Sequence, residues 1–167
     1  MTFDWECYLS LSEAMMDKAE ELKGDATQEC LREAYLRSAL SRFYYGVYGI
    51  AENILSRYIP KPHTHAFVFC EYESSPYKPV KKVGENLKRL WKYRKKADYD
   101  EEIKDSHDEI MDIEAVLDAA DKANKKARNT VKQIKELESD GFLTSSTFSK
   151  ERCEKHLVQS PTRTSPE

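Results

Sequence analysis

Apolar residues recur along the chain at steps of three and four, the spacing typical of amphipathic α-helices. The first such pattern predicts a helix over residues 4–23, and Gly24 is a natural C-terminal stop for it. A second pattern runs over residues 28–58 with no proline before Pro60. This helix is much longer than the mean of about 11 to 12 residues, so we expect it to be the scaffold of the fold.

The pattern after Pro60 predicts two more helices. Residues 64–73 are aromatic and β-branched enough for a strand, but they have no hairpin partner, so we predict a short helix. Pro79 suits the first position of a third long helix, predicted over residues 79–97.

A last helix is predicted over residues 108–138. Ser106 and Glu109 have the spacing of a capping box in front of it, and Gly141 ends it. The remaining stretch, residues 139–167, is rich in Ser and Thr and reads as a flexible C-terminal tail.

Together these elements predict an all-α fold. We expect an antiparallel up-and-down bundle of four main helices plus a short one, forming one domain over residues 1–138. Scarce glycine and proline, five and six residues, agree with long helices rather than a many-turned β fold.

Composition narrows the classes of function. The chain has 167 residues, 34% of them charged, and a formal net charge of -3. Bulk charge therefore does not favour nucleic acid as a partner, and any such binding needs a local basic patch. No apolar run approaches the roughly 20 residues of a membrane helix, and the N-terminus lacks the features of a signal peptide. We expect a cytoplasmic protein without membrane contact.

Cysteines and histidines give no sign of a metal site. A zinc site needs three or four ligands with defined spacing, which neither set offers, and we expect no metal and no cofactor. In a reducing cytosol the cysteines would be free thiols, namely Cys7, Cys30, Cys70 and Cys153.

Arg42 is the unusual residue of the long central helix. It stands among apolar residues, and Tyr45 and Tyr48 follow it at helical spacing. A buried arginine needs partners, so one interpretation is a structural clamp between helices. The other is a functional site, in which Arg42 could hold a phosphate through two parallel hydrogen bonds.

A basic stretch in the third long helix is the second candidate. Positive charge interleaved with Trp91 and Tyr93 suits RNA, through phosphate pairing and base stacking. The alternative is a solvated helix face. The basic residues are Lys88, Arg89, Lys92, Arg94, Lys95 and Lys96.

Three segments taken in order resemble the small prokaryotic HEPN-domain proteins. They are SRFYYGVYGIAENIL at 41–55, KPHTHAF at 61–67 and LWKYRKKADYD at 90–100. The resemblance implies an antiparallel helical bundle that forms a homodimer. It also implies a metal-independent ribonuclease or a toxin paired with a minimal nucleotidyltransferase.

The family's catalytic motif is incomplete in this chain. Arg42 matches its arginine, but the histidine position seven residues later is Gly49. RNA cleavage needs a group that moves protons near neutral pH, which glycine cannot do. Tyrosine is a poor base because its pKa is about 10. His65 would have to reach the site from outside the helix.

Three hypotheses follow. The first is a non-catalytic HEPN-like module of a toxin–antitoxin or defence-type system, a homodimer that binds RNA, a nucleotidyltransferase or another protein. The second is a metal-independent endoribonuclease toxin that uses Arg42 with Tyr45, Tyr48 or His65. The third is a purely structural helical protein in which Arg42 is a clamp.

Overall fold

The computed structural model describes residues 3–61, 63–100 and 111–153, and these contain helices and no strand. The prediction of an all-α fold is thereby confirmed. The four long helices are α1 (Glu6–Glu21), α2 (Glu29–Leu55), α4 (Lys78–Tyr99) and α5 (Ile113–Ser139). The shorter ones are the 3₁₀ turn η1 (Ala26–Gln28), α3 (His65–Glu73) and α6 (Lys150–Cys153).

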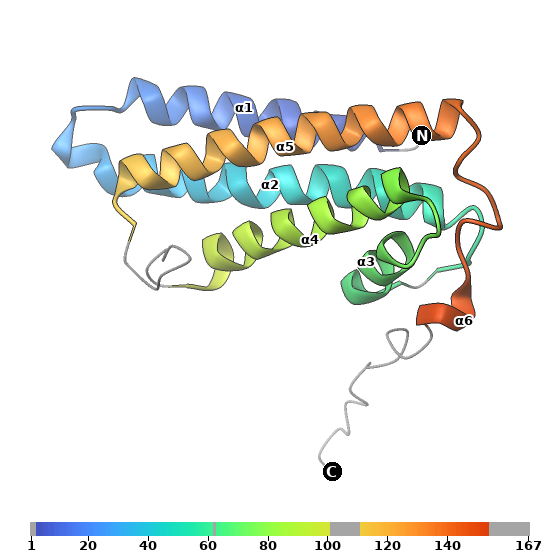
Figure 1. The fold of residues 1–167 in the computed structure, drawn as a ribbon. Helices are drawn as coiled ribbons and strands as arrows, with labels where there is room; N and C mark the ends of the chain where they lie inside the picture. Colours follow the sequence, from blue (N-terminus) through green and yellow to red (C-terminus); the bar gives the residue numbers. More distant parts are fainter. Residues whose placement is uncertain (1–2, 62, 101–110, 154–167) are drawn as a thin grey trace, which may run out of the picture.

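Helix α2 is the central element of the bundle. It packs against α1, α4 and α5, while α3 lies mainly against α4 (Figure 1). Successive long helices run side by side in alternating directions, as the up-and-down prediction requires. The part of α2 that faces its neighbours is mainly apolar, and its almost completely buried residues include Leu36, Leu40, Phe43 and Val47.

The helix ends follow local chemistry. The Thr64 hydroxyl accepts a hydrogen bond from the Phe67 amide at 3.1 Å, which fixes the start of α3. Gly24 and Gly141 follow α1 and α5 with positive φ angles of 87° and 72°, a conformation that glycine adopts without strain. Among the described residues, no helix combines the length and apolar character needed to cross a bilayer.

The start of α5 differs from the prediction. Asp112 is extended, and its carboxylate accepts a hydrogen bond from the Ala115 amide at 2.8 Å. The helix therefore begins at Ile113, because this N-cap completes the first turn. The predicted capping box of Ser106 and Glu109 lies outside the described residues.

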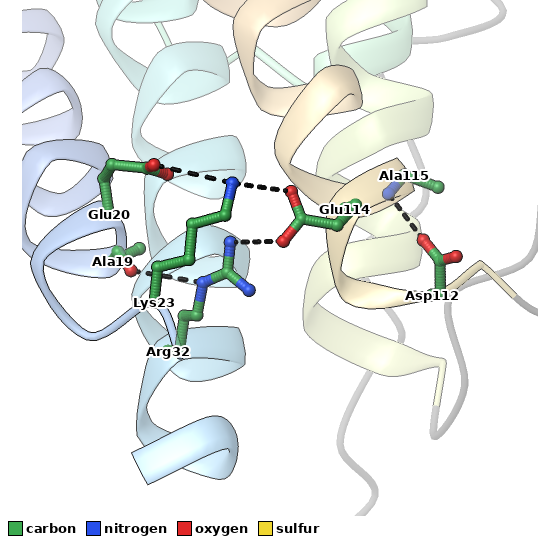
Figure 2. A network of polar contacts seen from close by, with 7 residues as sticks. All are labelled: Ala19, Glu20, Lys23, Arg32, Asp112, Glu114 and Ala115. Carbon is green, nitrogen blue, oxygen red and sulfur yellow. Dashed lines mark hydrogen bonds and ion pairs between the residues drawn. The ribbon is translucent and has the colours of Figure 1, made fainter. Parts of the chain in front are cut away.

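Arg32 links three helices at one end of the bundle. Its side chain is 6% exposed, and its Nε donates to the Ala19 carbonyl at the end of α1 (Figure 2). Its terminal nitrogen donates to Glu114 of α5 at 2.8 Å. Lys23 pairs with Glu114 at 3.3 Å and with Glu20 at 3.6 Å, so the same carboxylate receives two cations.

Part of the predicted flexible tail over residues 139–167 is packed against the bundle. Residues 142–153, here called the C-terminal strap, fold back onto the bundle and bury Leu143, Phe148 and Cys153. Cys153 forms a disulfide with Cys70 of α3, so these two cysteines are not free thiols. The apolar residues of the strap, sparse in the sequence, supply the packing. Residues 154–167 lie outside the described part.

Glu71 of α3 is enclosed by the strap. Its side chain is fully buried, and its Oε2 accepts a hydrogen bond from the Ser149 amide at 2.7 Å. Among the described residues, Oε1 has no partner. Burial raises the pKa of Glu71, and the Ser149 amide and the Arg152 guanidinium oppose this rise only in part.

We expect Glu71→Gln to remove a pH dependence of stability. Because the folded-state pKa of Glu71 is raised, its contribution is most favourable at low pH and becomes unfavourable as pH rises through and above the unfolded value. The variant should therefore gain thermal stability relative to the wild type as pH increases from 5 to 8, by an order of about 1 kcal/mol. Melting curves at several pH values measure this, and a constant difference between the two proteins would contradict it.

Candidate functional site

Two glycines of α2 determine how closely α1 approaches. A Cβ atom on Gly46 would lie 2.1 Å from Cδ1 of Leu9, and one on Gly49 would lie 2.0 Å from the ring of Trp5. The indole of Trp5 therefore occupies the space into which a side chain at position 49 would extend. The expected resemblance would have a histidine at this position, and here Trp5, the N-cap residue of α1, fills the space.

Arg42 lies on the α1 side of α2 and is only half-buried. Its guanidinium carbon is 5.5 Å from the centre of the Tyr8 ring, a cation–π distance. Within the described residues, no hydrogen bond or ion pair connects Arg42 to Tyr45, Tyr48 or His65. The buried arginine that clamps helices together is Arg32, which the sequence analysis did not single out.

We expect the two arginines to differ in their effect on stability. Arg32→Ala leaves the Ala19 carbonyl without its donor and removes the link to Glu114, and it should lower the free energy of unfolding by about 2 kcal/mol. Arg42→Ala removes one ring contact and should cost less than about 1 kcal/mol. Urea denaturation of both variants tests this, and equal losses would show that Arg42 is also a clamp.

Three tyrosines of α2, Tyr44, Tyr45 and Tyr48, lie around His65 at the start of α3. The ring centres of Tyr48 and His65 are 4.4 Å apart, and those of Tyr45 and His65 are 6.3 Å apart. The buried Tyr44 hydroxyl hydrogen-bonds to Nδ1 of His65. We call these four residues the tyrosine–histidine cluster. It includes three of the predicted site residues, Tyr45, Tyr48 and His65, and leaves Arg42 outside.

The Tyr44 hydroxyl and Nδ1 of His65 share a hydrogen bond whose donor depends on the His65 tautomer. Burial, with the nearby Tyr48 and Tyr45, raises the pKa of Tyr44, so its phenol keeps its proton at neutral pH. Burial and then the Arg94 guanidinium lower the pKa of His65 below its usual range, against the opposing effect of Glu52. At neutral pH the imidazole is therefore uncharged, and its Nδ1 is engaged by Tyr44.

Arg94 of α4 borders the tyrosine–histidine cluster. Its guanidinium lies 5.4 Å from the Tyr45 ring centre and 4.7 Å from that of Tyr99, and a terminal nitrogen donates to the Tyr99 hydroxyl at 2.9 Å. Its Nε is 2.7 Å from Oδ2 of Asp98. Arg94 is therefore held between two rings beside a carboxylate that balances its charge.

A basic groove of about 850 Å³ lies between α4 and α5. Its lining includes the apolar residues Leu40 of α2, Met111, Ala115 and Ala119. Among the described residues, six basic side chains and one acidic residue, Asp118, line it, and Tyr93 is the aromatic residue in the lining. The basic residues are Arg89, Lys92 and Lys96 on α4 with Lys122, Lys125 and Lys126 on α5.

Positive charges in the basic groove repel one another. Burial, then Arg89 and Lys82, lower the pKa of Lys126. The ion pair of Lys122 with Asp118 offsets one of the cations. A bound polyanion would relieve the remaining repulsion, which makes the groove a candidate anion site.

The predicted basic stretch is divided by the helical turn of α4. Arg89, Lys92 and Lys96 face the basic groove, whereas Lys88 pairs with Glu73 at 3.1 Å. Lys95 lies 4.9 Å from the Trp91 ring centre, and Arg94 borders the tyrosine–histidine cluster.

The sequence analysis missed the contribution of α5 to this groove. Lys122, Lys125 and Lys126 follow one another at the spacing of a helix face, and that spacing was the available signal. No group of three or more His, Cys, Asp or Glu side chains in the described part of the chain could hold a metal ion.

The fold and these sites define an all-α antiparallel bundle with a basic interhelical groove. Comparison with known proteins adds no relative: no family model, no curated protein and no solved structure matches the chain. The interpretation of function therefore depends on the residues and their geometry.

We expect the penalty of a side chain at position 49 to depend on Trp5. Gly49→Ala should lower the free energy of unfolding by about 2 kcal/mol, because its Cβ meets the indole ring. In a Trp5→Ala background the same substitution should be neutral or stabilising by up to about 1 kcal/mol, since alanine favours helix over glycine. A double-mutant cycle by urea denaturation measures this coupling, and an equal penalty in both backgrounds would contradict the packing.

Proposed function

We propose that this chain is a non-catalytic, HEPN-like module that binds single-stranded RNA in the basic groove between α4 and α5. The observation that carries the proposal is the concentration of six basic side chains against one acidic residue among the described residues of the groove, on a chain whose formal net charge is -3. Basic residues on a concave surface that excludes most acids are the electrostatic footprint of polyanion binding.

The composition of the groove supports a single strand over a duplex. Its lining combines basic residues of both helices with apolar residues and the Tyr93 ring. Phosphates would contact the basic side chains, while unpaired bases would contact the apolar residues and stack on an aromatic side chain. In a duplex the bases are already stacked on one another, so the apolar residues would have no partner.

The tyrosine–histidine cluster does not supply what the ribonuclease alternative needs. Strand cleavage at neutral pH requires a group that accepts a proton from the 2′-hydroxyl. Nδ1 of His65 is engaged by the Tyr44 hydroxyl, and within the described residues no hydrogen bond joins the imidazole to Arg42, so the two residues do not act as one site. Burial, then Glu52 and Tyr45, raise the pKa of Tyr48, which makes this phenol an even poorer source of a base than usual.

Partners named by the resemblance stay predictions. A homodimer and a minimal nucleotidyltransferase are expected from the HEPN-like segments at 41–55 and 90–100. The half-buried Arg42 and the exposed Tyr99 remain on the surface, where a second chain could reach them.

We expect loss of charge in the groove to weaken RNA binding and its salt dependence. The test variant is Lys92→Gln/Lys125→Gln/Lys126→Gln, and the probe is a fluorescent single-stranded RNA of about 12 nucleotides. Each phosphate contact to a single strand contributes about 0.7 to the slope of log Kd against log salt concentration. Loss of three contacts should therefore reduce this slope by about 2 and the affinity by at least about tenfold. Fluorescence anisotropy at several salt concentrations measures both.

The matched control removes three exposed lysines elsewhere on α4 and α5, in Lys78→Gln/Lys81→Gln/Lys132→Gln. It changes the net charge equally and should keep the wild-type affinity and slope. Equal losses of affinity in both variants would show that net charge alone drives binding, and would contradict the proposal that RNA binds in the basic groove. Tight binding of an acidic peptide without RNA binding would assign the groove to a protein partner instead. RNA cut by the wild type but not by His65→Gln would contradict the non-catalytic assignment.

A further inference from the structure

The C-terminal strap is attached to α3 by one covalent bond and a few weaker contacts. The Phe148 ring centre lies 5.1 Å from that of Tyr72. The Ser149 amide donates to buried Glu71, and Arg152 donates to the Ser74 carbonyl at 2.8 Å. The disulfide between Cys70 and Cys153 joins residues that are 83 positions apart in sequence, with Cα atoms 5.8 Å apart.

The two sulfurs of this disulfide differ in access. Cys153, at the end of the strap, is fully buried, whereas Cys70 on α3 is partly exposed. A thiol from solvent would therefore attack Cys70 and displace Cys153. The Ser74 hydroxyl is 3.6 Å from the Cys70 sulfur and 3.8 Å from the Cys153 sulfur, so it can donate a hydrogen bond to the departing thiolate.

We propose that Cys70 and Cys153 form a reversible thiol–disulfide site for low-molecular-weight thiols of the glutathione class, and that its reduction releases the C-terminal strap from α3. A glutathione thiolate forms a mixed disulfide with Cys70 and expels Cys153 as a thiolate, which takes up a proton. A second glutathione thiolate then attacks the sulfur of the bound glutathione and expels Cys70. The products are two protein thiols and one glutathione disulfide, and the reverse sequence oxidises the protein.

We expect release after reduction because the docked strap keeps the carboxyl group of Glu71 buried. Its Ser149 amide satisfies one oxygen of Glu71, while the other oxygen has no described partner, so a docked strap holds an acid away from water. Helix α6, which carries Cys153, has four residues and is too short to be stable alone. Once the covalent bond is broken, hydration of Glu71 opposes the apolar packing of Leu143 and Phe148, and the strap can leave α3.

The experiment equilibrates the protein in glutathione mixtures that range from strongly reducing to strongly oxidising. Thiol alkylation followed by mass spectrometry gives the fraction of the Cys70–Cys153 bond, and brief trypsin treatment reports on the strap through cleavage after Arg152. This guanidinium is bound to Ser74 and Thr147 when the strap is docked, so the oxidised protein should resist cleavage. Reduced protein should be cut at least tenfold faster.

Two double variants make the result specific. Cys70→Ser/Cys153→Ser should be cut at the reduced rate in every mixture. Cys7→Ser/Cys30→Ser removes the two exposed free thiols and should keep the wild-type response. A bond that remains oxidised in mixtures of cytosolic composition would identify a permanent staple and overturn the proposal. Equal cleavage rates of reduced and oxidised protein would contradict the proposal that reduction releases the strap. RNA affinity is measured separately on the lysine variants, so either proposal can fail without the other.

Discussion

The close contact between α1 and α2 at Gly46 and Gly49 determines how the surfaces of α2 are used. Without side chains at these positions, Trp5 and Leu9 pack directly against the α2 backbone. Dense packing at such a contact leaves no room for an added Cβ, since interiors transmit small volume changes as strain. At these two positions the α1 side of α2 is thereby committed to close packing, which leaves no room there for a side chain of any kind.

The close packing of α1 on α2 separates Arg42 from the tyrosines that lie close to it in the sequence. Arg42 remains beside α1 with Tyr8, whereas Tyr44, Tyr45 and Tyr48 turn toward His65 on α3. A site that joined the arginine with an imidazole on α2 would need a side chain at position 49. The geometry instead gives a neutral imidazole whose Nδ1 is engaged by a buried phenol, while Arg42 contacts the Tyr8 ring away from it.

The helices could be predicted from local sequence patterns. The role of Arg32, the disulfide and the docked C-terminal strap could not, because they depend on contacts between residues far apart in the sequence. Three- and four-residue periodicity sufficed for all four long helices because each buries one continuous stripe. The role of Arg32 was not visible, since its partners are 13 and 82 positions away in the sequence. Pairing of Cys70 with Cys153 has no local signal either. A Ser- and Thr-rich composition concealed the apolar residues that dock the C-terminal strap, of which Phe148 is the clearest.

Helix α4 keeps the two proposed activities of the molecule physically apart. One flank of α4 faces α5 and contributes Arg89 and Lys92 to the basic groove, while α3, which carries Cys70 and the strap, packs against a different part of its surface. The basic groove and the disulfide site share no described side chain. The free energies of RNA binding and of disulfide reduction should therefore add with little coupling. Coupling between RNA affinity and the state of the disulfide would require α4 itself to shift, because it is the helix that contacts both.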